Sequence, residues 1–96
     1  MYRNPKLLKL ASKSPCQCCG IEDFTIVAAH SNQLIDGKGM GIKAHDYRIA
    51  YLCYKCHSEI DQGKMSATNR TEMLEYAHRK TIGWLFEQGY IDVRSQ

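Results

Sequence analysis

The sequence predicts a small α+β domain that is held together by a bound metal ion. Two segments of its 96 residues alternate in the way short strands do, and helical patterns lie towards both ends of the chain. Four cysteines form two Cys-x-x-Cys pairs, one before the first strand and one after the second. A domain of this size buries only about 60% of its unfolded surface, so such a cross-link is needed. We expect one domain over residues 1–96.

Two short helices follow from local patterns. The segment Pro5–Lys13 places leucines on one face and lysines on the other, and Ser14-Pro15 ends it. A second helix is expected from Tyr54 to about Gln62, where Gly63 ends it. The first helix precedes the strands and the second follows them directly.

Two strands are expected at Phe24–His30 and Asp46–Leu52. Alternate residues of a strand point to opposite sides, so each segment divides into two faces. One face of the first strand is formed by Phe24, Ile26, Ala28 and His30. One face of the second is formed by Tyr47, Ile49 and Tyr51.

The last helix is the longest. Thr68 or Asn69 can cap its start, and it runs to about Gln88, with Gly89 as its stop. An apolar stripe at helical spacing indicates core packing and not a cofactor site. The stripe consists of Leu74, Ala77, Thr81 and Leu85, widened by Met73 and Trp84. The short tail that begins at Tyr90 is expected to pack back on the domain.

The chain has five cysteines, and four of them are spaced as metal ligands. Cys16 pairs with Cys19 and Cys53 with Cys56, so four sulfurs can surround one zinc ion at about 2.3 Å each. Cys18 is the odd sulfur, because adjacent ligands would strain a tetrahedral site. Disulfides are the alternative. No signal peptide precedes the cysteines, and zinc in a reducing cytoplasm suits an odd number of them better.

The net charge is too small to identify a partner. It is +3, from 13 Lys and Arg against 10 Asp and Glu. Four thiolates and one Zn²⁺ would add −4 + 2 = −2, which leaves about +1. The basic residues around the cysteines and the glycine loop predict either a basic face or an ordinary solvated surface. They are Lys6, Lys9, Lys13, Lys38, Lys43, Arg48 and Lys55. No membrane-spanning run is present, so no membrane partner is expected.

A loop rich in glycine joins the two expected strands. Its stretch 37–41 alternates glycine with other residues, but it lacks the Gly-Lys-Ser/Thr ending of a P-loop. It is either a flexible connector or a loop whose bare backbone approaches a phosphate chain together with Lys38 and Lys43. These two lysines and Arg48 are the residues that we expect to contact nucleic acid.

Two histidines stand out by their positions. His30 closes the first strand and precedes the polar pair Ser31-Asn32, whereas His57 follows the second cysteine pair at once. An isolated histidine at a strand end is usually structural, but a position beside a metal centre favours a functional role. His45 is a reserve ligand only, and His78 on the last helix is ordinary.

The expected order is a strand that ends in His30, the glycine loop, a second strand and a helix that carries His57. In this order of elements the chain resembles the ββα-metal, or His-Me finger, core of the HNH endonucleases. It is most similar to the small phage and prophage nucleases of the YbcO type. The likeness covers nearly the whole chain, and an upstream histidine together with Cys-x-x-Cys-His is more specific than either half alone. It is carried by Ala29-His30, the Gly-Lys-Gly-Met-Gly run at 37–41, Lys43, Asp46 and Cys53-x-x-Cys56-His57-Ser-Glu-Ile-Asp61.

The resemblance implies a metal-dependent DNA endonuclease that serves phage recombination or DNA processing in a bacterial cytoplasm. A neutral His30 would take a proton from the attacking water near pH 7. His57 would help to hold a divalent cation, Mg²⁺ or Mn²⁺, at the leaving oxygen. A zinc ion held by four cysteines has no open position for that task.

The chain also departs from the HNH pattern. Many HNH enzymes have an acidic metal ligand where this chain has Ala29. Asp46 is the nearest candidate by position for the residue that orients the base, with Asn32 as a second. Asp61 or Glu59 would complete the cation shell, since one helical turn separates Asp61 from the metal histidine. The alternative for Asp61 is a role as a salt-bridge partner. The alternative function is a non-catalytic zinc module that binds nucleic acid or a protein partner.

Overall fold

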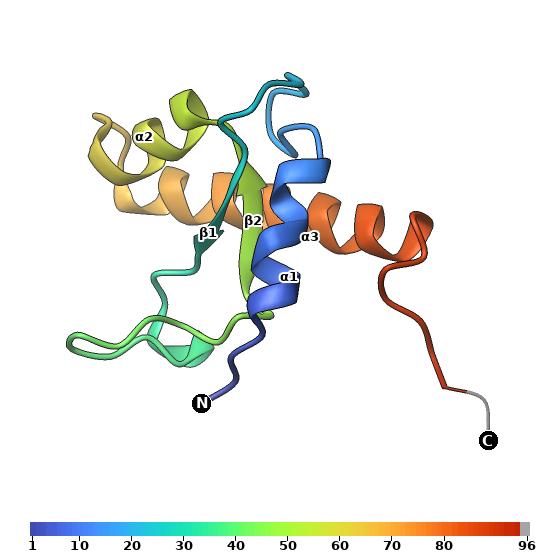
Figure 1. Cartoon of the computed structure of the whole chain (residues 1–96). Helices are drawn as coiled ribbons and strands as arrows, with labels where there is room; N and C mark the ends of the chain where they lie inside the picture. Colours follow the sequence, from blue (N-terminus) through green and yellow to red (C-terminus); the bar gives the residue numbers. More distant parts are fainter. Residues whose placement is uncertain (95–96) are drawn as a thin grey trace.

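Two short antiparallel strands lie at the centre of the fold (Figure 1). β1 (Val27–His30) pairs with β2 (Ile49–Leu52), so that His30 lies opposite Ile49 at one end of the sheet. The computed structural model describes residues 1–94.

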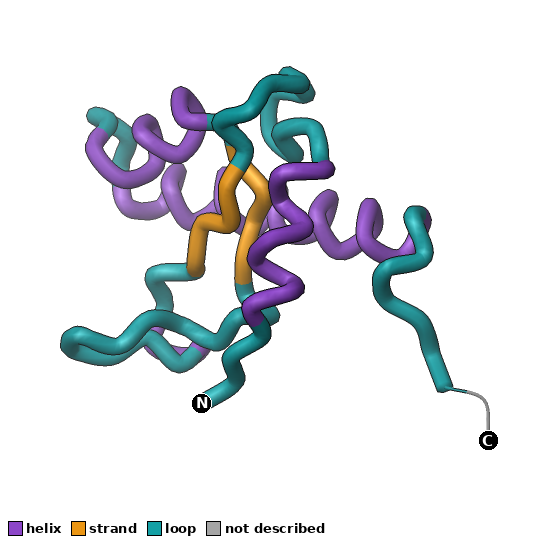
Figure 2. Tube along the Cα trace, viewed as in Figure 1, coloured by secondary structure: helices purple, strands orange, loops and turns teal. Residues whose placement is uncertain are grey.

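Three helices surround the sheet (Figure 2). Helix α1 (Pro5–Lys9) covers one side of the sheet, and α3 (Ala67–Glu87) crosses the other. Helix α2 (Tyr54–Gln62) follows β2 directly. The prediction of an α+β domain with an N-terminal helix and a long C-terminal helix is confirmed.

The first strand is shorter than predicted. β1 begins at Val27, and the side chain of Phe24 is fully exposed (100%). The carboxylate of Asp23 accepts hydrogen bonds from the backbone N–H (2.8 Å) and the hydroxyl (2.6 Å) of Thr25. An aspartate that binds the backbone two residues further on forms a turn. The alternating pattern therefore overstated the strand by three residues.

The second strand begins at Ile49 and not at Asp46. Residues 46–48 form a turn instead, in which the N–H of Arg48 donates to the carbonyl of His45 (2.9 Å). All four residues of β2 are buried, so the predicted division into two faces is not seen. The reason is that elements cover both sides of β2. The Tyr51 hydroxyl donates to a carbonyl of α1, and the Tyr51 N–H donates to α3.

The predicted N-terminal helix divides into two parts. Helix α1 ends at Lys9, and residues Leu10–Lys13 continue as a 3₁₀-helix, η1. The side chain of Asn4 caps α1 by accepting from the N–H of Leu7 (3.1 Å). Helix α2 has the predicted bounds. Gly63 is its C-cap. The residue is a glycine because any side chain there would overlap the carbonyl oxygen of Glu59.

Helix α3 begins earlier than predicted, but its buried face is the predicted one. Ser66 caps it, since its hydroxyl accepts from the N–H of Asn69 (3.1 Å), so the choice of Thr68 or Asn69 as the cap is wrong. The buried stripe of α3 also makes a hydrogen bond to the sheet. The hydroxyl of Thr81 accepts from the N–H of Tyr51 (3.0 Å), which ties α3 to β2. The buried residues of α3 are Leu74, Ala77, Thr81 and Leu85.

The tail begins to pack back, as predicted. The ring of Tyr90 lies 5.6 Å from that of Trp84, and Ile91 contacts the core. Beyond that point the side chain of Val93 is 79% exposed. Of the tail residues up to position 94, only those at its start therefore add to the packing.

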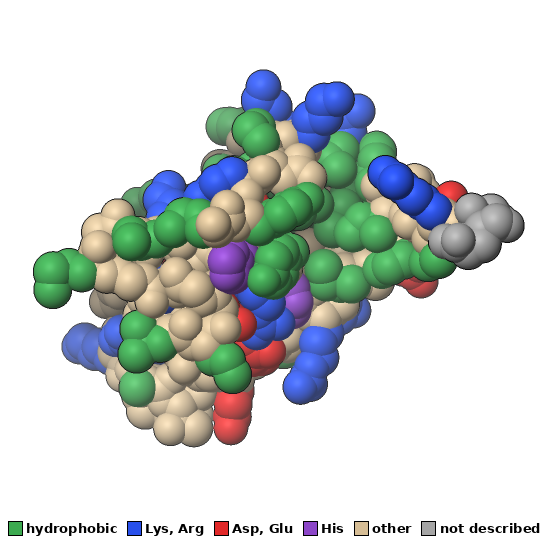
Figure 3. Space-filling model, turned by 90° about the horizontal axis from the view of Figure 1, so that it is seen from below, with side chains coloured by type: hydrophobic (Ala, Val, Ile, Leu, Met, Phe, Trp, Pro, Cys, Tyr) green, Lys and Arg blue, Asp and Glu red, His purple; other side chains and the backbone are tan. Residues whose placement is uncertain are grey.

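The surface shows no single basic stripe on the face seen from below. Lys and Arg side chains are spread mostly around the edge of that face, with histidine and hydrophobic side chains near its centre (Figure 3). Within residues 1–94, no helix combines the length and the apolar character needed to cross a bilayer. On the face shown in Figure 3, a nucleic-acid contact would depend on particular basic residues and not on a continuous basic stripe.

Candidate metal centre and histidine cleft

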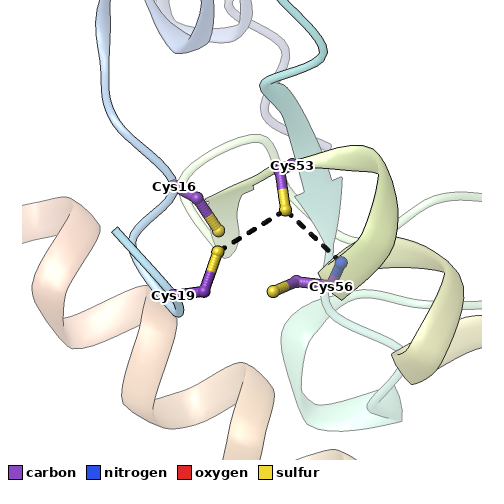
Figure 4. A group of neighbouring side chains, drawn as sticks. All are labelled: Cys16, Cys19, Cys53 and Cys56. Atoms are coloured by element: carbon purple, nitrogen blue, oxygen red, sulfur yellow. Dashed lines mark hydrogen bonds between the residues drawn. The ribbon is translucent and has the colours of Figure 1, made fainter. Parts of the chain in front are cut away.

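Four cysteines from two distant parts of the chain form one cluster. The sulfur atoms of the two pairs all lie within 4.8 Å of one another, and they point towards a shared centre (Figure 4). The sulfurs of Cys19 and Cys53 are 3.7 Å apart. A tetrahedral zinc ion with bonds of about 2.3 Å would separate its sulfurs by about 3.8 Å. The cluster of Cys16, Cys19, Cys53 and Cys56 thus fits a metal such as zinc.

A tight turn presents the first pair of cysteines. The N–H of Cys16 donates to the carbonyl of Ile21, and the N–H of Gly20 donates to the carbonyl of Cys16, both at 2.9 Å. Gly20 has a φ of 83°, in the left-handed region that glycine adopts most easily. The N–H of Gln17 donates to the carbonyl of Tyr51 (2.8 Å), so the turn is fixed to β2.

The second pair lies where β2 passes into α2. Cys53 is the N-cap of α2, and its sulfur accepts from the N–H of Cys56 (3.5 Å). The hydroxyl of Thr25, just before β1, accepts from the N–H of Tyr54 (3.0 Å). A metal bound here would fix the first turn of α2, and His57 is in that turn, with its N–H bonded to the carbonyl of Cys53 (2.9 Å).

The surroundings of the cluster shift the pKa values of its thiols in different directions. Burial raises the pKa of Cys53 and of Cys56, and contacts with the sulfurs of Cys16 and Cys19 raise it further. Burial also acts to raise the pKa of Cys16, but hydrogen bonds from the backbone of Cys19, Cys53 and Cys18 lower that pKa to about 7. A bound cation would be needed to hold all four sulfurs as thiolates, so metal binding releases protons.

Replacement of Cys18 is expected to leave the metal content unchanged. Cys18 is partly buried but lies outside the group of four ligands. Metal analysis of purified Cys18→Ser protein should give one ion per chain, as in the wild type. Cys19→Ser is the matched control, because it removes a sulfur of the cluster and should lower the occupancy. Loss of metal from the Cys18 variant would show that the ligand set is wrong.

A second site begins where β1 ends. Nε2 of His30 lies 2.8 Å from Oδ1 of Asp46, whose side chain is only 2% exposed. Burial acts to raise the pKa of Asp46, but the hydrogen bonds from His30 and Asn4 and the charge of Arg3 hold that pKa below its usual value. Asp46 is therefore a carboxylate and can only accept. Nε2 of His30 must then carry the proton, which leaves Nδ1 as the basic nitrogen.

The two predicted histidines open onto the same cleft. Its volume is about 350 Å³, and its lining includes His30 at the end of β1 and His57 on α2. Asp61 also lines it, with Oδ2 3.0 Å from Nε2 of His57. Lys38 and Lys43 of the glycine loop lie along its edge. Predicted residues from three separate segments are thus brought together.

The alternative residues that the sequence left open lie in different places. Asp46 contacts His30, whereas Asn32 lines the cleft without a hydrogen bond to that ring among the described residues. Asp61 faces the cleft, whereas Glu59 lines a groove on the cysteine side of α2. Over residues 1–94, the four cysteines are the one group of three or more clustered metal-ligating side chains. His57 and Asp61 therefore offer two ligand atoms without a third.

Arg48 does not line this cleft, and its predicted contact with nucleic acid stays a prediction. Its Nε donates to Oδ1 of Asp36 (2.8 Å), and its Nη2 pairs with Glu75 on α3. Asp36 also accepts from the hydroxyl of Ser31. The guanidinium is balanced by two carboxylates and ties the loop to α3, so these contacts are structural.

The other two histidines are structural as well. Nδ1 of His45 accepts from the N–H of Tyr2 (3.0 Å), and its ring stacks on Tyr47 with 5.0 Å between centroids. Nδ1 of His78 donates to the carbonyl of Ile49 (2.7 Å). His45 is thus not a reserve ligand of the cleft, and His78 holds α3 against β2.

Comparisons of the chain with protein-family models, with curated proteins and with solved structures find no match. The likeness to HNH endonucleases is therefore carried only by the sequence motifs and the element order. The function has to be argued from the chemistry of the cleft and of the cysteine cluster.

Proposed function

We propose that this protein is a metal-dependent DNA endonuclease of the HNH type, which hydrolyses phosphodiester bonds. One observation supports it most. The cleft is lined by a histidine that a buried carboxylate binds from behind, by a second histidine beside a carboxylate, and by two lysines. Phosphodiester hydrolysis needs a base, a cation site and a phosphate contact, which these groups can supply. The family likeness suggests phage recombination or DNA processing in a bacterial cytoplasm as the setting.

His30 would act as the general base. Nδ1 would take a proton from a water molecule in line with the scissile bond, since Nε2 is engaged with Asp46 at 2.8 Å. Asp46 would hold the ring in the required tautomer and stabilise the imidazolium that forms. An ionised partner of a catalytic histidine acts in this way in other hydrolases.

His57 and Asp61 would hold the catalytic cation. Mg²⁺ is commonly bound by one or two protein groups together with substrate phosphates and water, so two ligands in an open cleft are compatible with it. The bound cation would supply charge stabilisation at the leaving oxygen. The cysteine cluster would play no part in the reaction, because its four ligands fill a tetrahedral shell. It would instead fix the first turn of α2, which carries His57.

DNA binding is expected to depend on salt and to be similar for all sequences. Lys38 and Lys43 line the cleft beside a loop with no base-reading helix, so they would contact phosphates. Replacing both with alanine should weaken binding to every sequence equally and reduce the slope of log K against log salt by about 1 per lysine. Lys64→Ala with Lys80→Ala is the control, since neither residue lines the cleft. Selective loss of one DNA sequence would contradict a backbone contact.

The second candidate is a zinc module that binds nucleic acid without cutting it. It is favoured by the alanine at position 29 and by the lack of a third cation ligand beside His57 and Asp61 within residues 1–94. Both candidates predict salt-dependent DNA binding. Only the endonuclease predicts cleavage that requires a divalent cation and His30, so a cleavage assay separates them.

A further inference from the structure

The N-terminal segment contacts Asp46, the partner of His30, from more than forty positions away in the sequence. Nη1 of Arg3 lies 3.1 Å from Oδ1 of Asp46, the same oxygen that contacts His30. The guanidinium also donates to the carbonyls of Ala44 (2.6 Å) and Lys43 (2.8 Å). We infer that Arg3 is a positioning residue of the site, which holds Asp46 against His30. The inference rests on the proposed function.

The burial of Asp46 makes its partners necessary. A carboxylate that is 2% exposed is costly unless charge and hydrogen bonds compensate it. Oδ2 accepts from the N–H of Asn4 (2.6 Å), and Oδ1 accepts from His30 and Arg3. His30 is neutral in the proposed reaction, so Arg3 supplies the permanent positive charge.

Loss of that charge would change the proton arrangement of the base. A buried carboxylate that loses its cation draws compensation from the charge of its other partner. Imidazole is the more basic group of the pair, so an added proton would go to Nδ1 of His30 and not to Asp46. The imidazolium could no longer accept a proton from water. Arg3 thus keeps Nδ1 of His30 free for the reaction.

The geometry requires an arginine and not only a cation. One planar guanidinium reaches the Asp46 carboxylate and the two carbonyls that precede it along the chain, at positions 43 and 44. A lysine ammonium cannot match this fork. The same contacts fix the backbone of Lys43, whose side chain lines the cleft. The Arg3 side chain is 38% exposed, so a small cation from solution can reach its place.

The kinetic test compares Arg3→Ala and Arg3→Lys with Lys6→Ala. Lys6 is exposed and only three positions away, so its variant loses the same charge without touching Asp46. Arg3→Ala should lower kcat on the order of 10²-fold, the effect of a misplaced catalytic group. Its KM for DNA should change no more than that of Lys6→Ala. Guanidinium chloride at low concentration should partly restore Arg3→Ala but not His30→Ala, and Arg3→Lys should be intermediate.

A second readout does not depend on cleavage. ¹⁵N NMR of the histidine rings should show His30 protonated on Nε2 alone in the metal-loaded wild type and on both ring nitrogens in Arg3→Ala at the same pH. If the wild type does not cut DNA, the proposed function fails, and the ring protonation still decides the part about Arg3. Wild-type ring protonation or a wild-type kcat in Arg3→Ala would overturn the inference. If that variant does not fold, Arg3→Lys is judged by the same two measurements.

Discussion

Removal of the bound metal by a chelator is expected to unfold the domain. Structural zinc sites contribute roughly 10–16 kcal/mol of apparent binding free energy, which is comparable with the whole stability of a small domain, about 5–15 kcal/mol. The cluster joins the turn before β1 to the start of α2, and three of its four cysteines are buried in the core. Circular dichroism during titration with a chelator would follow the loss of helix.

Trp84 gives a second signal for the same transition. Its ring packs edge-on against Tyr51 of β2, with 6.0 Å between centroids, so its fluorescence should change when the sheet separates from α3. Added zinc should restore both signals. Cys53→Ser should be unstable even with zinc, whereas Cys18→Ser should behave as the wild type. A chelated protein with native helix content and tryptophan fluorescence would contradict the role of the metal in folding.

Replacement of His30 by alanine is expected to abolish most DNA cleavage. Removal of a general base typically lowers the rate by roughly 10²–10⁴-fold. The fold and the metal content should persist, because the His30 side chain lies at the edge of the sheet beside the cleft and is not a cysteine-cluster ligand. His78→Ala is the matched control, since that residue is on α3 and does not line the cleft. Rates of plasmid nicking give the measurement.

Replacement of His57 should also abolish cleavage, but for a different reason. The variant His57→Ala keeps the base and loses one cation ligand, so a higher concentration of Mg²⁺ or Mn²⁺ should restore part of the rate. His30→Ala should not respond to added cation. If excess cation restores His30→Ala and not His57→Ala, the two roles are assigned the wrong way round. A His30→Ala protein as active as the wild type would exclude His30 as the base.

Local patterns in the sequence were sufficient for much of the fold. The bounds of α2 and the buried face of α3 depend on spacing within one segment, which helical periodicity reports directly. The cysteine ligands follow from two pairs with the same spacing. By contrast, Asp23 converts the start of the predicted first strand into a turn through its side chain, and the alternation of apolar residues does not register that competition.

The parts of the site that were not predicted depend on contacts between distant segments. Asp46 was selected by position alone, and no local signal indicates that Arg3 and Asn4 bind it. Arg48 was expected to contact DNA because it is basic and lies near the glycine loop. Its charge in the sequence does not indicate which groups it pairs with in the fold. In the fold it meets Asp36 and Glu75, one on the loop and one on α3. Such pairings are set by tertiary packing, which a single sequence does not report.

The most direct test of the central proposal is plasmid cleavage by the purified, zinc-loaded protein during a titration with Mg²⁺ or Mn²⁺. The cleft geometry predicts cation-dependent cleavage that disappears in His30→Ala, while zinc content and DNA affinity remain. The same assay should include single-stranded and branched DNA as substrates. Absence of cation-dependent cleavage by the wild type on all three substrates would contradict the endonuclease proposal and leave the zinc-dependent binding module.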